Sequence, residues 1–143
     1  MLIRRATVFD VDAIMELGQD PCFSVSDEIH FYERKELLEW CVKTFDNILC
    51  VAEVDKKIIG FYYCKIFSYH WAMLDNFYVL PEYRGQQVSE MMLTTLKNLL
   101  KSKQIQYLSI LVDSADLKLL NQMKHRGFTL ANKEYQWLYK EIK

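Results

Sequence analysis

The chain has 143 residues, of which 51% are hydrophobic and 26% charged, and its formal net charge is −1. This length favours one domain, residues 1–143, with a sizeable core, and the composition excludes a disordered or collagen-like chain. Nucleic-acid binding relies on a basic surface, so the near-neutral charge argues against a nucleic-acid partner. No run approaches the roughly 20 uninterrupted apolar residues of a membrane span, so we expect no membrane association.

The cysteines favour a reduced, metal-free protein. The four are Cys22, Cys41, Cys50 and Cys64; they form no CxxC pair, and no histidine stands at ligand spacing. Reduced cysteines are typical of cytosolic proteins. The first residues also lack the long apolar segment of a signal peptide. We therefore expect a cytoplasmic protein without a metal.

The first 45 residues predict a strand followed by two helices. Residues 2–6 favour a short strand. Thr7 and Asp10 resemble a capping box at the start of the first helix. Ser26 or Asp27 is expected to cap the second helix. Its apolar residues recur at helical spacing and are Leu37, Leu38, Cys41 and Phe45.

From residue 48 onward, strand-like runs come first and then alternate with helical ones. The predicted elements are strands at 48–54, 57–67 and 71–80, a helix at 87–101, a strand at 106–112, a helix capped by Asp113 or Ser114 that includes Leu117, Leu120 and Met123, and a strand at 134–140. Asp55-Lys56 is typical of a hairpin turn, and Gly127 of a helix end. The nearly all-apolar run at 106–112 predicts a strand buried on both faces.

The helix after Pro81 connects two strands as a right-handed crossover would, which predicts an α/β fold around a central mixed sheet. The amides of that helix's first turn, together with its dipole, form an anion site. Arg84 lies just before the helix and can reach a phosphate, so a pyrophosphate would need no metal here. On this pattern alone, an ordinary strand–turn–helix without a ligand is the slightly favoured interpretation.

The same segment resembles the coenzyme-A loop of the GNAT N-acetyltransferase superfamily. Val79-Leu-Pro81-Glu-Tyr-Arg84-Gly85 follows a strand, as the family signature Arg/Gln-x-x-Gly-x-Gly/Ala does. Three further segments match in order: Ile3 to Thr7 with Asp10, Ile59-Gly60, and Arg126-Gly127-Phe128. The resemblance covers essentially the whole chain. It implies the GNAT acyl-CoA N-acyltransferase fold, with a mixed, mostly antiparallel twisted sheet of about six to seven strands flanked by four helices.

The resemblance also implies acetyl-CoA as acyl donor. In this family a bulge splays the fourth strand from the fifth. The pantetheine arm lies in the gap, held by backbone groups of the fourth strand, and amides of the loop surround the pyrophosphate. The cofactor-binding residues implied here are Phe77, Tyr78, Val79, Arg84, Gly85, Gln86, Gln87, Val88, Ser89 and Asp116.

Two positions depart from the family pattern. Gln87 stands where the first motif glycine is expected and Ser89 at the Gly/Ala position, and a Gln side chain can crowd the approach that glycine permits. Met123 occupies the position where many members carry a tyrosine that protonates the leaving thiolate. Because methionine cannot donate a proton, the thiolate would need another donor or water.

Asp75 is the first candidate for the general base and His70 the second, and each also has a purely structural interpretation. Between the first two helices, acidic residues form a local bias suited to a cationic amine, or simply a solvated helix face. They are Asp20, Asp27, Glu28 and Glu33, and the nearby rings are Phe23, His30, Phe31 and Tyr32.

The resemblance predicts an acetyl-CoA-dependent N-acetyltransferase that transfers the acetyl group directly to a small-molecule or peptide amine. The alternative is a catalytically inert GNAT-like module that binds an acyl-CoA or a protein, which the residues at 87 and 123 favour. Either form is expected as a monomer or a homodimer. Tyr135, Trp137 and Tyr139 on the last predicted strand would serve the dimer contact.

Overall fold

The computed structural model describes residues 1–24, 26–27 and 30–143, which form two compact units, residues 1–111 and 112–143. The first unit holds helices α1 (Val11–Leu17), α2 (Arg34–Val42) and α3 (Val88–Ser102). It also holds all strands that the described residues form. The second holds α4 (Leu117–His125). No helix in the described ranges is long and apolar enough to cross a membrane.

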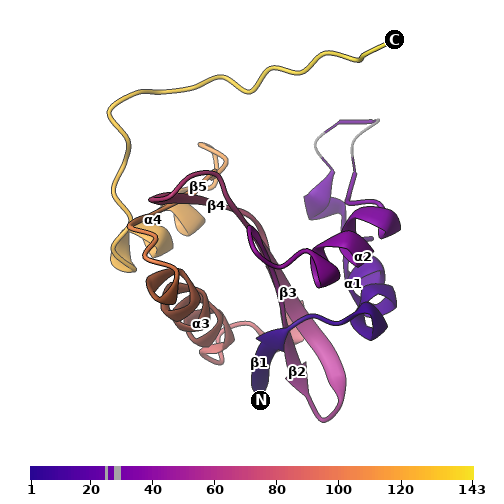
Figure 1. Cartoon of the computed structure of the whole chain (residues 1–143). Coiled ribbons are helices and arrows are strands. Elements are labelled where there is room, and N and C mark those ends of the chain that lie inside the picture. Colours follow the sequence, from indigo (N-terminus) through magenta and orange to yellow (C-terminus); the bar gives the residue numbers. More distant parts are fainter. Residues whose placement is uncertain (25, 28–29) are drawn as a thin grey trace. The chain divides into compact units, whose positions relative to one another are not determined.

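The strands of the first unit form one sheet in the order β1-β2-β3-β4-β5 (Figure 1). Their bounds are β1 Leu2–Arg5, β2 Asn47–Val54, β3 Lys57–Ile66, β4 Trp71–Val79 and β5 Tyr107–Ile110. Neighbours pair antiparallel except β4 and β5, which are parallel and joined through α3. The predicted mixed α/β architecture is therefore confirmed, with five strands among the described residues rather than six or seven.

Local signals placed several elements correctly. The backbone N–H of Thr7 donates to Asp10 Oδ2 at 2.7 Å, which closes the predicted capping box. Asp55 and Lys56 have φ values of 48° and 66°, the left-handed pair that a two-residue hairpin of the primed type needs. These features are decided by residues close in sequence, which is why the pattern predicts them.

The start of α2 was predicted wrongly. Neither Ser26 nor Asp27 caps it: the helix begins after Glu33, whose backbone N–H donates to Glu36 Oε2 at 2.8 Å in a capping box. Phe45 lies beyond the helix and is 88% exposed, so it is not part of the buried stripe. A Glu at the cap position carries little sequence signal, because Ser, Thr, Asp and Asn dominate there.

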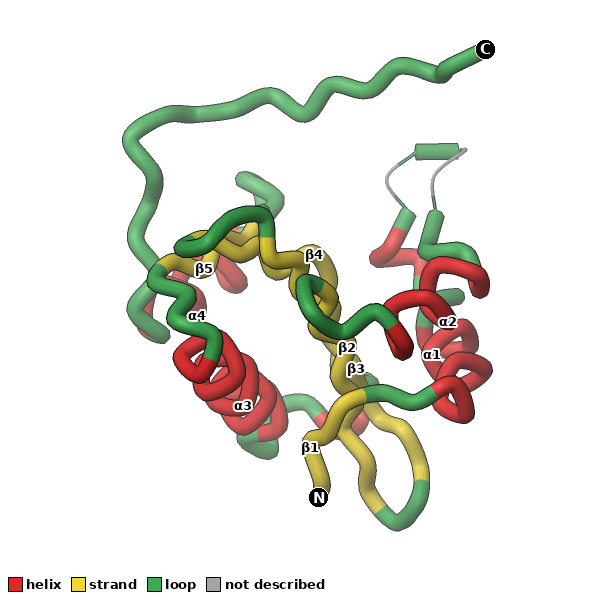
Figure 2. Tube along the Cα trace, in the orientation of Figure 1, coloured by secondary structure: helices red, strands yellow, loops and turns green. Residues whose placement is uncertain are grey.

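The two faces of the sheet bury separate cores, and helices cover both faces (Figure 2). The α3 face, with α3 itself, contributes Ile48, Cys50, Ala52, Ile59, Tyr62, Cys64, Ala72, Leu74, Val79, Val88, Met92, Leu96 and Leu100. The α1/α2 face, with its helices and connecting segments, contributes Ala6, Val11, Ile14, Leu17, Phe23, Leu37, Leu49, Val51, Phe61, Tyr63 and Tyr78.

The expectation that residues 106–112 form a strand buried on both faces is wrong. Tyr107 is 65% exposed and Leu111 is 70% exposed, and no residue of β5 is fully buried. β5 lies at one edge of the described sheet and pairs with β4 alone. An edge strand shields its side chains from one side only, whatever their hydrophobicity.

In the second unit, Asp116 caps α4, where Asp113 or Ser114 had been expected, and its Oδ1 accepts from Leu119 N at 3.0 Å. Gly127, with φ +93°, ends the helix as predicted. Its N–H donates to Lys124 O and that of Phe128 to Met123 O, the paired bonds of a Schellman motif.

The predicted strand at 134–140 is not formed. Tyr135, Trp137 and Tyr139 are 78%, 67% and 59% exposed, and residues 134–140 carry no ladder bonds. Alternating side chains favour a strand only when a neighbouring strand satisfies the backbone groups. The alternating pattern of this segment is therefore compatible with a strand but does not by itself form one.

Candidate functional site

A bulge in β4 divides the strand into two differently paired halves. The β3–β4 register runs from Cys64 opposite Leu74 to Tyr63 opposite Asn76, so Asp75 is the extra residue. Pairing with β5 also ends at Leu74, opposite Ile110. Residues 75–79 of β4 are therefore paired to β3 alone, which is the splay that the family resemblance led us to expect.

The backbone of this half of β4 presents groups away from β3. Leu80 N donates to Ile59 O at 2.8 Å, and hydrogen bonding alternates along an antiparallel pair. The N–H and C=O groups of Phe77 and Val79 therefore point away from β3, toward the side on which β5 no longer pairs with β4. The Val79 carbonyl there accepts a bond from Arg84 Nε at 2.8 Å.

Tyr78 differs from its two neighbours on the strand. It stands opposite Phe61 in the ladder, so its backbone faces β3. Its side chain lies on the α1/α2 face, and its hydroxyl donates to Asp20 Oδ2 at 2.6 Å. Burial and the Asp20 carboxylate raise the pKa of Tyr78 to about 12. Both the backbone and the side chain of Tyr78 are therefore engaged in contacts within the protein.

The segment from β4 to α3 presents free amides at a helix start. A short helical turn at Pro81–Tyr83 leads to Gly85, with φ +77°, and then to Gln87, which precedes the first residue of α3. The Gln87 side chain makes no capping bond, so the first-turn amides of Val88, Ser89 and Glu90 have no partner within the helix. Residues 84–87 are exposed, whereas the Val88 side chain is buried in the α3-face core.

Gln87 adopts a backbone conformation that favours glycine. Its φ of 64° and ψ of 10° lie in the left-handed region, which costs a residue with a Cβ about 1–2 kcal/mol. This is the position where the family resemblance expects the first motif glycine. The loop is therefore left-handed at a position where this chain carries a residue with a Cβ.

The Arg84 side chain turns toward the α1/α2 face. Its guanidinium carbon lies 5.4 Å from the centre of the Tyr78 ring, and its charge is one of the influences that lower the pKa of Asp20. The expected phosphate contact of this side chain would require it to leave that position. Gln86 also bonds within the protein, from Nε2 to Glu82 O at 3.2 Å.

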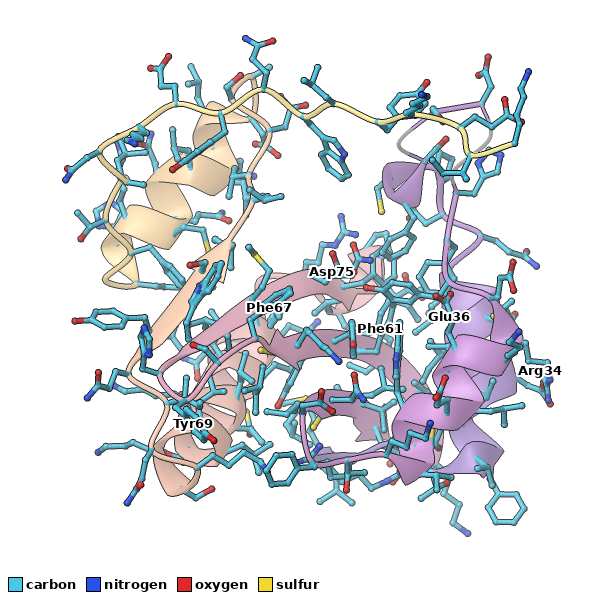
Figure 3. All side chains as sticks on the ribbon, turned by 45° about the horizontal axis from the view of Figure 1, so that its top comes forward. Arg34, Glu36, Phe61, Phe67, Tyr69 and Asp75 are labelled. Atoms are coloured by element: carbon cyan, nitrogen blue, oxygen red, sulfur yellow. The ribbon has the colours of Figure 1, made fainter. Side chains whose placement is uncertain are left out.

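Asp75 belongs to a hydrogen-bonded group of three side chains. The Tyr32 hydroxyl donates to Asp75 Oδ2, and Asn76 Nδ2 donates to the Tyr32 hydroxyl at 2.6 Å. Burial, and then the Asp75 charge, hold the pKa of Tyr32 far above its usual value, so the phenol stays neutral. Asp75 itself is exposed and lies on β4, where Figure 3 labels it on the sheet. No local spacing signals the pairing of residues 32 and 75.

His70 is not brought to this group. It stands just before β4, five residues and roughly 17 Å of strand from Asp75. Its carbonyl accepts from Gln106 N and Tyr107 N at 3.0 and 2.9 Å, which ties the start of β4 to β5. The geometry therefore favours Asp75 of the two candidate bases.

A pocket of about 700 Å³ lies beside α1, in the region where the sequence predicts the acceptor. Its lining includes Glu16, Gly18, Asp20, Ser24, His30 and Phe31. Of the other predicted acidic residues, Asp27 is exposed, Glu33 caps α2, and Glu28 lies outside the described residues. The Tyr78 hydroxyl, followed by Cys22 N, lowers the pKa of Asp20, which keeps a negative charge at the pocket.

The remaining predicted residues lie in the second unit. The Asp116 carboxylate caps α4, and Met123 is 8% exposed on the same helix. Within the described residues, no group of three or more His, Cys, Asp or Glu side chains is placed to hold a metal ion.

Three solved structures illustrate the fold that this chain shares. A PaiA N-acetyltransferase from Thermoplasma acidophilum, in complex with coenzyme A, has a TM-score of 0.80 at 20% identity, covering 93% of this chain and 92% of its own. An aminoglycoside acetyltransferase from an uncultured soil metagenomic sample, in complex with sisomicin, has a TM-score of 0.79 at 15% identity. The match covers 99% of this chain and 96% of that protein's chain. A ribosomal-protein-alanine N-acetyltransferase from Brucella melitensis has a TM-score of 0.75 at 11% identity. The match covers 97% of this chain and 100% of that protein's chain.

The comparison with curated proteins finds no match. The family comparison does: the profile described as Acetyltransferase (GNAT) family matches residues 11–128. That range runs from the first residue of α1 to the residue after Gly127, and it includes the bulged strand and the loop before α3. The chain belongs to the acetyltransferase (GNAT) family.

Proposed function

We propose that this acetyltransferase is an acetyl-CoA-dependent N-acetyltransferase that acts on a small-molecule or peptide amine. The observation that carries the proposal is the half-paired end of β4, which has a carboxylate at its bulge and leads into the uncapped start of α3. When bound, acetyl-CoA supplies the acetyl group for transfer. The free amides at residues 85–90 fit its diphosphate, since a helix start binds anions through its N–H groups and its dipole.

Each part of the strand has one task in this proposal. The backbone groups of Phe77 and Val79 hold the pantetheine arm. Asp75 accepts the proton of the attacking amine, and the Tyr32 hydroxyl orients the carboxylate for this step. Because Asp75 is exposed, an amine can reach it from solvent.

Calorimetry with acetyl-CoA, followed by an assay of free CoA thiol with a panel of primary amines, tests the proposal. We expect saturable binding and amine-dependent thiol release. The absence of binding at millimolar acetyl-CoA would refute both the enzyme and an acyl-CoA-binding role.

The second candidate is an inert acyl-CoA-binding module. It is favoured by the left-handed Gln87 and by Met123, a residue without a proton to give. The same assays separate the two functions. Binding without thiol release across the amine panel would support the module, whereas release with any amine would support the enzyme.

A further inference from the structure

Three contacts connect the loop before α3 with the segment after α1. The Arg84 guanidinium lies 5.4 Å above the Tyr78 ring, and the Tyr78 hydroxyl donates to Asp20 Oδ2 at 2.6 Å. Asp20 Oδ1 accepts the backbone N–H of Cys22 at 2.9 Å. All four residues belong to the first unit. The path therefore runs from the expected diphosphate site to the short helical turn at Pro21–Phe23.

The two charged residues on this path have opposite signs. Arg84 is cationic and Asp20 anionic, and the Tyr78 ring lies between them. The Tyr78 hydroxyl does most to lower the pKa of Asp20, and the positive charge of Arg84 acts in the same direction. At neutral pH the carboxylate is charged and the Tyr78 phenol is neutral, so both contacts of Tyr78 are intact.

Each of these two charged residues also borders a different binding region. Asp20 lines the pocket beside α1. Arg84 is the first residue of the loop whose amides are free. Its Nε donates a hydrogen bond to the Val79 carbonyl, on the side of β4 that does not pair with β5. A diphosphate at residues 85–90 would compete with the Tyr78 ring for the guanidinium, since phosphate pairs with Arg strongly and often bidentately. The charge that offsets Asp20 would then move away.

We propose that Tyr78 is a positioning residue that couples the two sites: a diphosphate at the loop draws Arg84 from the Tyr78 ring, and the contact with Asp20 passes the change to residues 20–22. The proposal rests on coenzyme A binding at the proposed site. The negative charge of Asp20 becomes less compensated, so a cationic amine in the pocket is favoured when the coenzyme is present. Linkage makes the effect reciprocal, with a coupling of about 5–150-fold typical of such pairs.

The test follows the backbone amide of Cys22 by NMR while coenzyme A is added to the ¹⁵N-labelled protein. In the wild type we expect its resonance to shift and to saturate with the coenzyme. Tyr78→Phe keeps the ring under Arg84 but removes the bond to Asp20, so it should lose most of the Cys22 response even when saturated with coenzyme A. Arg84→Gln, at an exposed position, should lose it as well.

Tyr83→Phe is the matched control, because it removes a tyrosine hydroxyl beside the same loop from a ring packed against the α3-face core. It should keep the full Cys22 response. An unshifted Cys22 amide in the saturated wild type, or an unchanged response in Tyr78→Phe, would overturn the coupling while leaving the proposed function standing. Failure of the wild type to bind coenzyme A would overturn both.

Discussion

The two faces of the sheet are packed with different kinds of side chain. The α3 face buries mainly aliphatic residues, and among the residues that the structure describes Tyr62 is its one fully buried ring. The α1/α2 face buries two tyrosines whose hydroxyls reach polar partners: Tyr63 donates to Asn47, and Tyr78 to Asp20. A tyrosine fills apolar space and carries a polar group to its far end. Tyrosine packing therefore lets polar partners, the Asn47 amide and the Asp20 carboxylate, lie next to the α1/α2-face core.

Adjacent residues of β3 show the contrast most directly. Tyr63 points to the α1/α2 face and donates to Asn47 Oδ1 at 2.6 Å. Tyr62 points to the α3 face, where its buried hydroxyl lies near the Cys50 thiol, a weak partner, but makes no hydrogen bond of good geometry to any described residue. The α3 face thus stabilises the fold and accommodates polar atoms poorly, whereas the α1/α2 face adjoins the proposed chemistry. Substitutions on the two faces should separate stability from activity.

The largest effect is expected at Asp75. Asp75→Asn removes the proposed base but keeps the side-chain shape, so amine acetylation should fall about 10²–10⁴-fold with little change in unfolding free energy. The measurements are steady-state thiol release and urea denaturation. Asp55→Asn, in the exposed hairpin turn, is the matched control and should leave the rate unchanged. A rate loss below tenfold in Asp75→Asn would assign the base elsewhere.

Leu96 tests the α3 face in the opposite way. It is fully buried, so Leu96→Ala should lower the free energy of unfolding by about 2–5 kcal/mol through lost burial and a residual cavity. At a temperature where the variant is folded, its acetyl-CoA affinity should match the wild type. Leu138→Ala, at a site 87% exposed, should change stability by no more than about 0.5 kcal/mol.

The Arg4–Asp10 pair gives the α1/α2 side a pH-dependent contribution. Burial acts to raise the pKa of Asp10, but the Arg4 guanidinium and the Thr7 N–H outweigh it, and the pKa is lowered overall. Because the folded-state pKa lies below the unfolded value, this stabilisation is present above about pH 4 and is lost as pH falls through the folded pKa. Asp10→Asn should cost about 1.5–3 kcal/mol at pH 7.

Urea denaturation of Asp10→Asn and wild type between pH 3 and 7 checks this contribution. The stability difference between the two proteins should shrink as pH falls below about 4. A difference that stays constant over that range would show that the pair contributes through packing alone.

The two neighbouring tyrosines should respond with opposite signs. Tyr62→Phe removes a buried hydroxyl that makes no hydrogen bond of good geometry and should raise the free energy of unfolding by about 1 kcal/mol. Tyr63→Phe breaks the bond to Asn47 and should lower it by a similar amount. Thermal and urea unfolding of the pair serve as each other's control. Equal losses in both variants would mean that Tyr62 has a polar partner in solution.

The smallest effect is expected at the coenzyme loop. Gln87→Gly removes the cost of the left-handed conformation, about 1 kcal/mol, and opens the approach to the amides. Calorimetry should show acetyl-CoA binding a few-fold more tightly. Gly85→Ala, which introduces the same kind of cost at φ +77°, is the converse variant and should weaken binding. Weaker binding by Gln87→Gly would show that the Gln side chain contributes contacts.

The sequence predicted best those features that neighbouring residues decide. The Thr7–Asp10 box, the Asp55-Lys56 turn and the end of α4 at Gly127 each depend on a few adjacent positions. The resemblance singled out residue 87 because Gln replaces an expected glycine there, but its left-handed backbone became visible only in the structure.

Features that depend on distant partners were missed. Tyr32 lies 43 positions from Asp75 along the chain, so no spacing rule pairs them. The exposure of β5 follows from its place at the sheet edge, and the absence of a strand at 134–140 follows from the lack of a paired neighbour. The hydrophobic pattern indicates which secondary structure a segment favours. Whether that structure forms and is buried depends on the neighbouring strands and helices that the tertiary fold supplies.

Gly18 affects the position of the Phe31 ring as well as the end of α1. A Cβ built at this position would lie 2.2 Å from the Phe31 ring, so that ring occupies the space a side chain would fill. Phe31 precedes Tyr32, whose hydroxyl bonds Asp75. The volume of one residue at the end of α1 therefore sets how far the aromatic segment can approach the sheet. Gly18 offers protein engineers a steric adjustment for the proposed base, at a position that never touches it.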